Sequence, residues 1–223
     1  MLKRTLIILL AATATILSCK KKPVPPPDDT PHIGELMEVI SPYDSLFRRY
    51  AAEICWDWML IASVAYQESK FYNNLESWAG AKGLMGIMPS TARSLGIDPD
   101  SLGNPEISVR AGVKCLDMIS EYYTDIDNSD ERTKFILASY NAGIGHIADA
   151  RSLATKYGKD ASKWDGNVDE FIRLKREPEY YNDSVCKYGY LRGDETFRYV
   201  KEVMARFKLY KSVGKTSEPK SGE

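Results

Sequence analysis

Apolar residues recur three and four positions apart through most of the chain, from about Ser41 to Tyr210. No convincing run in this region alternates apolar and polar residues, as a half-buried strand does. The pattern therefore predicts a predominantly α-helical fold. One helix is expected from Ser129 or Asp130 to Gly143, and the last helix from about Asp194. The residues that the last helix should bury are Val200, Val203, Phe207 and Tyr210.

A further helix start stands at Asn104-Pro105-Glu106. An N-cap residue, a proline suited to the first turn and an acid near the positive end of the helix dipole follow one another here. The helix that begins at this signal carries its apolar residues on one face, which predicts that the face packs into the core. These residues are Val109, Val113, Leu116 and Tyr123.

The segment from Asp57 to Ser69 is apolar at nearly every position, which is typical of a buried helix. Ile61, Val64 and Ala65 form one stripe of this helix, and the next position on the stripe is Glu68. Burial and the negative end of the helix dipole both favour the neutral form of a carboxyl group there. An acid that keeps its proton near neutral pH can protonate a leaving oxygen. Periodicity alone also allows a frayed helix end, with Glu68 turned into water.

Glycines follow this helix at every third position, at Gly80, Gly83 and Gly86. Such spacing lets a backbone approach a neighbour closely, and it is equally typical of a structural turn and of a ligand-facing loop. The sequence also allows Ser90 or Thr91 to cap the next helix.

Composition and charge narrow the range of functions. The 43% of hydrophobic and 27% of charged residues are those of a globular protein. With 30 Lys plus Arg against 31 Asp plus Glu, the chain offers no overall field for a polyanion, so nucleic acid is not expected as a partner. His32, His146 and four scattered cysteines lack the spacing of a zinc site, so neither a metal nor any other cofactor is inferred.

Four short motifs occur in order along the chain and resemble the four successive motifs of the soluble lytic transglycosylase (SLT) domain. This goose-lysozyme-like family cleaves peptidoglycan. The resemblance spans about residues 43–210. The motifs are Glu68-Ser69, Gly83-Leu84-Met85-Gly86-Ile87-Met88-Pro89-Ser90-Thr91-Ala92, Ala138-Ser139-Tyr140-Asn141-Ala142-Gly143 and Glu195-Thr196-Phe197-Arg198-Tyr199-Val200.

Two further segments resemble the catalytic half of the membrane-bound murein transglycosylase F group. They are Tyr188-Gly189-Tyr190-Leu191-Arg192-Gly193 and the stretch from Gly145 to Arg151. In that group a domain similar to solute-binding proteins precedes the catalytic half. Here a proline-rich spacer stands in its place.

The resemblance implies a lysozyme-like α+β fold of the goose type, with at most a small sheet near residues 71–88. It implies that Glu68 is the sole catalytic carboxylate, because the N-acetyl group of the muramic acid sugar replaces the second carboxylate of other retaining glycosidases. Cleavage of the MurNAc-GlcNAc β-1,4 bond would then leave 1,6-anhydromuramic acid ends. Peptidoglycan glycan strands are the implied partner. The implied substrate-binding residues are Ser69, Ser77, Met85, Gly86, Met88, Tyr140, Asn141, Glu195 and Tyr199.

Gly86 departs from the family pattern, which has a substrate-binding glutamine at this place. Losing one polar contact costs about 1–3 kcal/mol of binding, but it leaves the acid in place. Two alternatives to a transglycosylase stay open at this point. One is a hydrolase of the goose-lysozyme kind, and the other is a non-catalytic lipoprotein that binds peptidoglycan.

The N-terminus reads as a secretory signal. Lys3 and Arg4 precede an apolar run over residues 6–17, which is too short to span a bilayer core as a helix. The small Ser18 before Cys19 resembles a bacterial lipobox, in which the cysteine is lipidated after cleavage. The alternatives are an uncleaved anchor and an ordinary signal peptide with an incidental cysteine.

Four parts are therefore expected along the chain. A lipoprotein signal peptide covers residues 1–18, and lipidated Cys19 begins a proline-rich spacer over 19–40. The catalytic domain covers 41–211, and 212–223 form a loose polar tail. This order predicts a membrane-anchored lipoprotein that faces the periplasm, with the outer membrane as the expected membrane. The cysteines left after cleavage allow at most one internal disulfide, and the sequence does not select the pair.

Overall fold

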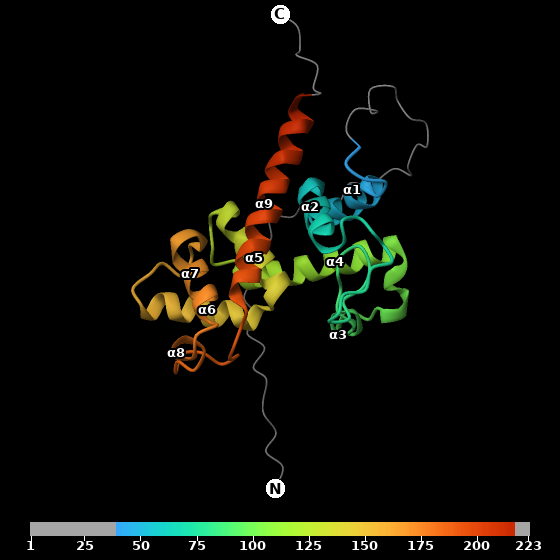
Figure 1. The fold of residues 1–223 in the computed structure, drawn as a ribbon. Coiled ribbons are helices and arrows are strands. Elements are labelled where there is room, and N and C mark those ends of the chain that lie inside the picture. The colour runs from blue at the N-terminus through green and yellow to red at the C-terminus, as the bar shows by residue number, and fades with distance from the viewer. Residues whose placement is uncertain (1–38, 217–223) are drawn as a thin grey trace, which may run out of the picture. The chain divides into compact units, whose positions relative to one another are not determined.

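Helices make up nearly all of the regular structure in the computed structural model, which describes residues 39–216 (Figure 1). No named strand occurs within these residues, so the prediction of a predominantly α-helical fold is confirmed. The α-helices are α1 (Asp44–Glu53), α2 (Trp58–Ser69), α3 (Pro89–Ser94), α4 (Pro105–Ser120), α5 (Ser129–Ala142), α6 (Ile144–Lys156), α7 (Asp169–Leu174), α8 (Pro178–Tyr181) and α9 (Gly193–Thr216). Shorter helical turns are η1 (Pro99–Gly103), η2 (Glu121–Tyr123) and η3 (Trp164–Val168).

Side-chain caps define three of the helix starts. The carboxylate of Asp57 accepts from the backbone N–H of Met59 at the start of α2, at 2.9 Å. Asn104 and Asn128 do the same for α4 and α5. These contacts satisfy N–H groups that have no partner inside the helix. The predicted starts of α4 and α5, and the end of α5 at Gly143, are confirmed.

Four details of the predicted helices are wrong. Tyr123 lies in η2, beyond the end of α4. Neither Ser90 nor Thr91 caps α3, because the helix already begins at Pro89, whose fixed φ suits the first turn. The last helix reaches Thr216 and so includes the first residues of the expected tail. Phe207 and Tyr210, which the sequence predicts to be buried by this helix, are only half-buried.

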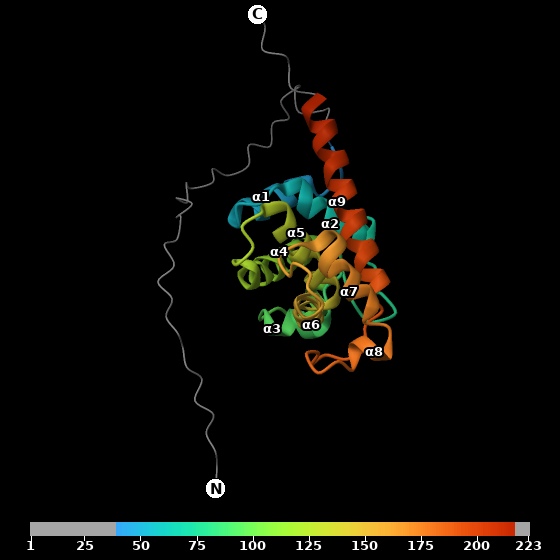
Figure 2. The same ribbon diagram turned by 90° about the vertical axis from the view of Figure 1, so that its left-hand side faces the viewer.

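The long helix α9 packs against α2, α5 and α7 and so joins the two halves of the described region. It runs along one side of the other helices and projects past them toward its C-terminal end (Figures 1 and 2). Its own residues Val200 and Val203 are buried. Because α2 ends with the first motif, Glu68-Ser69, and α9 begins with the last, this packing brings the first and last motifs together.

The segment between α2 and α3 forms two isolated antiparallel bridges in place of a sheet. Lys82 is bridged to Glu76 on one side and to Ile87 on the other. The backbone N–H of Gly83 also donates to the carbonyl of Leu75 at 3.1 Å. These bridges lie where the family resemblance implies a small sheet.

A buried ion pair holds the segment that leads into α9. The ammonium of Lys175, which is fully buried, donates to Asp149 Oδ2 at 2.5 Å and lies 3.2 Å from His146 Nδ1. Asp149 also accepts from the backbone N–H groups of Lys187 and Tyr188, at 2.8 and 2.9 Å. These contacts lower the pKa of Asp149, although burial acts in the opposite direction. Through these bonds, the buried pair holds the backbone at Lys187 and Tyr188, shortly before α9 begins.

Several expectations lie outside the described residues. They are the signal peptide over 1–18, the lipidation of Cys19, all but the end of the spacer, and the tail beyond 216. Within residues 39–216, no helix combines the length and the apolar character needed to cross a membrane. Cys115 is a buried thiol and Cys186 a half-buried thiol, so these two do not form the internal disulfide.

Candidate active site

Glu68 lies in the last turn of α2 and faces the first half of α9. The hydroxyl of Tyr199, on α9, donates to Glu68 Oε1 at 2.6 Å. Tyr199 itself is almost completely buried. The structure therefore joins residues that are 131 positions apart in the sequence.

The surroundings of Glu68 favour its protonated form. Burial raises the pKa of Glu68 to about 7, while the hydrogen bond from Tyr199 and the charge of Lys70 act in the opposite direction. Glu68 as a whole residue is nevertheless only half-buried. A carboxylic acid that is half protonated near pH 7 suits proton transfer in both directions.

Gly86 touches the same carboxyl group. A Cβ atom at this position would lie 2.2 Å from Glu68 Oε2, and the backbone φ of +59° also favours glycine. Compared with the family pattern, which has a glutamine here, Gly86 lacks a polar side chain. The structure adds that no side chain fits at residue 86 while Glu68 keeps its present position.

Tyr140 and Asn141 lie at the end of α5, close to the same region. The hydroxyl of Tyr140 donates to the carbonyl oxygen of Met85 at 2.7 Å. Burial raises the pKa of Tyr140 well above its usual value, with Cys115 and Glu68 acting in the same direction. The side chain of Asn141 is exposed, and its Oδ1 accepts from Thr196 at 2.9 Å. Asn141 is therefore available to a ligand.

Met85 and Ser69 do not lie where the family resemblance implies. Met85 is completely buried and packs on Gly112 of α4, where a Cβ would lie 2.6 Å from the methionine Cε. Met85 is therefore part of the core and is not open to a substrate, although the family resemblance implies that it should be. The buried hydroxyl of Ser69 donates to the carbonyls of Ala65 and Leu84 at 3.0 and 2.9 Å. Ser69 therefore ties the glycine segment to α2 and does not face a ligand.

The other predicted residues are open to solvent and do not pair with the acid. Ser77 is exposed, and its Oγ accepts from the N–H of Ala81 at 3.0 Å. Glu195 is exposed and forms an ion pair with Arg192 at 3.1 Å. Met88 has 39% of its surface exposed. Contact of these three with a substrate stays a prediction.

Cys115, on α4, is the residue of this region that sequence reasoning misses. Burial raises the pKa of its thiol to about 11, and the charge of Glu68 adds to the effect. Cys115 also influences the pKa of Tyr140 and of Tyr199. It therefore contributes a neutral, weakly polar group beside the acid. No spacing or motif marks it in the sequence.

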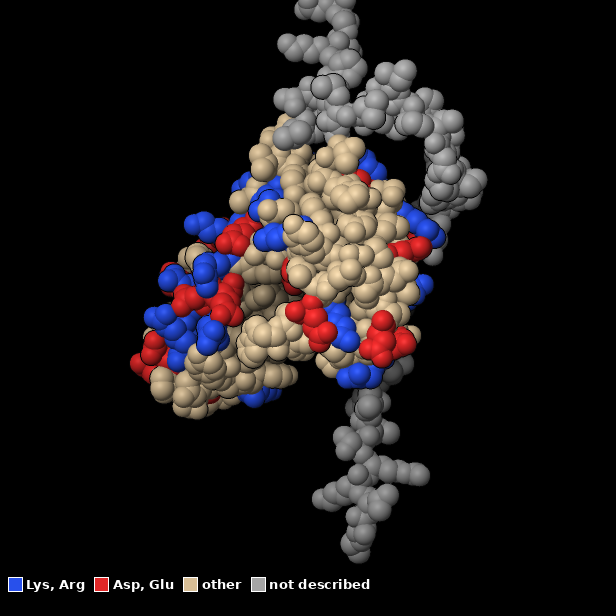
Figure 3. Space-filling model, turned by 45° about the vertical axis from the view of Figure 1, so that its right-hand side comes forward, with Lys and Arg blue, Asp and Glu red and all other residues tan. Residues whose placement is uncertain are grey.

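One face of the molecule is hollowed. In Figure 3 the Lys, Arg, Asp and Glu side chains gather densely to the left of the hollow, and the surface to its right and above is mostly uncharged. The two sides of the hollow thus differ in chemistry.

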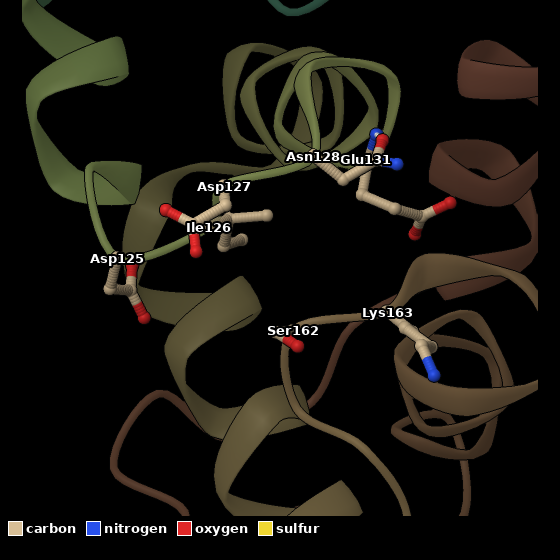
Figure 4. Close-up of a pocket in the computed structure, with 7 residues that line it drawn as sticks. All are labelled: Asp125, Ile126, Asp127, Asn128, Glu131, Ser162 and Lys163. Carbon is tan, nitrogen blue, oxygen red and sulfur yellow. Dashed lines mark hydrogen bonds between the residues drawn. The ribbon is translucent and has the colours of Figure 1, made fainter.

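A separate pocket lies among Asp125–Asn128, Glu131, Ser162 and Lys163 (Figure 4). It shares no residue with the surroundings of Glu68. Two of its three acids are already paired, Asp125 with Arg151 at 2.5 Å and Glu131 with Lys134 at 2.6 Å. Within residues 39–216, no group of three His, Cys, Asp or Glu side chains is arranged to hold a metal ion.

Comparison with known families decides which family this site belongs to. The family model of the transglycosylase SLT domain matches residues 45–163, which is more than half of the chain. The chain belongs to the SLT transglycosylase family. Both Glu68 and Tyr140 lie inside the matched SLT region, whereas Tyr199 lies beyond it.

Curated SLT relatives share this part of their sequence with the chain. The membrane-bound lytic murein transglycosylase F of Vibrio campbellii is 39% identical over 186 residues, which are 83% of this chain and 33% of the relative. The protein of the same name from Maricaulis maris is 40% identical over 161 residues, which are 72% of this chain and 34% of the relative. The chain thus spans about a third of the length of these relatives.

Solved SLT structures share the fold. The 70 kDa soluble lytic transglycosylase SLT70 of Escherichia coli matches with a TM-score of 0.52 and 24% identity, over 76% of this chain and 24% of that chain. An inactive mutant of the lytic transglycosylase Slt of Pseudomonas aeruginosa matches with a TM-score of 0.53 and 21% identity, over 80% of this chain and 25% of that chain. The prediction of a lysozyme-like fold is therefore confirmed.

Proposed function

We propose that the chain is a lytic transglycosylase that cleaves the MurNAc-GlcNAc β-1,4 bond of peptidoglycan, with Glu68 as the single acid and base. The observation that carries the proposal is the environment of Glu68. Its pKa is raised to about 7 by burial, and its side-chain hydrogen-bond partner is the hydroxyl of Tyr199. Membership of the SLT family and the names of the curated relatives support the substrate class.

In the first step, Glu68 donates its proton to the glycosidic oxygen, and the bond between that oxygen and C1 of the muramic acid sugar breaks. The N-acetyl oxygen of the same sugar stabilises the positive charge at C1, so that a second carboxylate is not needed. Tyr199 then donates its hydrogen bond to a carboxylate, which is a stronger interaction than with the neutral acid.

In the second step, the Glu68 carboxylate accepts the proton of the C6 hydroxyl, and O6 forms a bond to C1. The acid is restored, and the product is a 1,6-anhydromuramic acid end with no water added. Tyr140 and Asn141 line the cleft beside the reacting sugar in this proposal. Ser77, Glu195 and Met88 contact the strand farther from the acid.

The mass of the released muropeptides tests the reaction. Purified sacculi are digested with the protein and with Glu68→Gln as the inactive control. The proposal predicts products that are lighter by one water than those of a hydrolase, and none from the control. Products with reducing ends would show the goose-lysozyme hydrolase. Binding to sacculi without any release would show the non-catalytic lipoprotein.

The same proposal places the enzyme at the periplasmic side of a membrane, with the outer membrane as the expected membrane and lipidated Cys19 as the anchor. The lipobox-like sequence supports this, as does the description of the curated relatives as membrane-bound. Expression of Cys19→Ala in a Gram-negative host tests it by fractionation. The variant should leave the membrane fraction, and retention of the variant there would contradict a lipid anchor.

A further inference from the structure

Trp78 is the most exposed large apolar side chain among the described residues, with 99% of its surface open to solvent. A single exposed apolar residue is common on protein surfaces and explains nothing by itself. Two further features of Trp78 point to a ligand. Hydrogen bonds close the turn that carries it, and β-bridges connect that turn to the segment beside Glu68.

The backbone that carries Trp78 is closed by hydrogen bonds. The N–H of Ser77 donates to the carbonyl of Ala81 at 2.9 Å, and the N–H of Gly80 donates to the carbonyl of Ser77 at 2.8 Å. The Oγ of Ser77 accepts a third bond from the N–H of Ala81. The turn from Ser77 to Ala81 therefore holds the indole outward at a defined place, although the side chain itself packs on nothing.

The turn connects directly to the surroundings of Glu68. One bridge joins Glu76 to Lys82, the next joins Lys82 to Ile87, and the neighbouring Gly86 touches the Glu68 carboxyl group. Two interstrand spacings separate the backbones of Glu76 and Ile87 by roughly 10 Å. Trp78 follows Glu76 by two residues, in the turn that the Glu76–Lys82 bridge closes, and so belongs to the same bridged segment as Gly86.

The chemistry around Trp78 favours a neutral ligand. The turn Ser77–Ala81 carries no charged side chain. Exposed apolar side chains lie along the same stretch, between α2 and the start of α3. These exposed residues are Tyr72, Leu75 and Met88.

We propose that Trp78 stacks on a pyranose ring of the glycan strand, beyond the two sugars that flank the cleaved bond. This inference rests on the proposed function. Sugars with equatorial substituents present faces of axial C–H groups, which pack on the flat indole, while the indole N–H can donate to a hydroxyl group. Of the two charged residues that flank the turn, Glu76 is exposed and the ammonium of Lys82 is already paired with Asp100 at 3.4 Å, so the turn itself offers a charged stem peptide no ionic partner. Trp78 therefore favours long strands over short ones.

Binding in the inactive Glu68→Gln protein tests the proposal without cleavage. Peptide-free GlcNAc-MurNAc tetrasaccharide and octasaccharide are the probes, and calorimetry gives their affinities. In the Glu68→Gln background, Trp78→Ala should weaken octasaccharide binding by about 3- to 10-fold, the range of one aromatic contact. Binding of the tetrasaccharide should change less. Trp78→Phe should restore most of the preference for the longer strand.

Tyr122→Ala is the matched control, because Tyr122 is 59% exposed and lies in η2, outside the Glu68 region. The inference is overturned if Trp78→Ala leaves octasaccharide affinity unchanged, if it weakens both oligomers equally, or if Tyr122→Ala weakens the octasaccharide as much. A wild-type protein that releases no muropeptides, while binding still depends on Trp78, would overturn the proposed function alone.

Discussion

Two carboxyl groups, that of the half-buried Glu68 at the end of α2 and that of the buried Asp149 in α6, have pKa values displaced in opposite directions. Burial disfavours the charge on both. At Asp149 the ammonium of Lys175 and two backbone N–H groups outweigh that effect. At Glu68 the direct partner is a neutral hydroxyl, that of Tyr199, and burial prevails. The hydrogen-bond partners, and not burial alone, therefore decide that Asp149 is a charged structural residue and that Glu68 can hold a proton near neutral pH.

Replacing Glu68, the proposed proton donor, should have the largest effect. Glu68→Gln keeps the shape of the side chain but cannot transfer a proton, so we expect the rate of muropeptide release to fall about 10²–10⁴-fold. Glu53→Gln is the matched control, because Glu53 is exposed at the end of α1. The initial rate of release from sacculi measures both variants. A Glu68→Gln rate within a few fold of wild type would remove Glu68 from the mechanism.

Replacing Asp149 should lower the stability of the fold. Asp149→Asn leaves the Lys175 ammonium buried without its counter-charge, so the free energy of unfolding should drop by about 3–5 kcal/mol in urea titrations near neutral pH. The folded pKa of Asp149 lies below its unfolded value, so its contribution is present above about pH 4 and is lost as the pH falls through the folded pKa. The gap between wild type and variant should therefore narrow in acid. A loss of unfolding free energy below about 1 kcal/mol would contradict a structural role for the Asp149–Lys175 pair.

The pH dependence of stability should have the opposite sign at Glu68. Its folded pKa is raised from 4.5 to about 7, so ionisation destabilises the folded state as the pH rises between these values. Glu68→Gln removes this loss. After allowance for partial exposure, we expect the variant to match wild type at pH 4.5 and to be about 1–3 kcal/mol more stable at pH 8. An equal stability difference at both pH values would be inconsistent with the raised pKa.

The smallest effect should come from the hydroxyl that tunes Glu68. Tyr199→Phe removes a hydrogen bond that lowers the pKa of Glu68, so the alkaline limb of the rate profile should move to higher pH. The maximal rate should fall about tenfold, as expected for one hydrogen bond to a charged group. Tyr140→Phe is the control, because its hydroxyl donates to the Met85 carbonyl. Equal shifts in both variants would argue against a specific role for Tyr199.

The sequence predicts the helical parts of this account well. The apolar stripe of α2 leads to Glu68, and the start signal at Asn104 and the stop at Gly143 lie where the helices begin and end. Periodicity works there because one face of a helix is buried at regular intervals.

The sequence predicts irregular segments, and contacts between residues far apart in the chain, less well. Met85 lies in the core, where it packs against Gly112 of α4. The sequence does not show this contact, because it depends on how closely two distant segments approach. Asp149 and Lys175 are 26 residues apart, and each reads as an ordinary charged residue until the fold buries both. The contact of Gly86 with Glu68 likewise arises only once the bridges of Lys82 turn the glycine segment back onto α2.

Titration of the carboxyl groups tests the central claim most directly. Protein labelled with ¹³C at the glutamate side-chain carboxyl is followed by NMR across the pH range, with Glu68→Gln as the assignment control. The account predicts one glutamate signal with a pKa of about 7 that is missing from the variant. If every glutamate signal instead titrates below about pH 5, as unperturbed carboxyl groups do, Glu68 is charged at neutral pH and is not the proton donor described here.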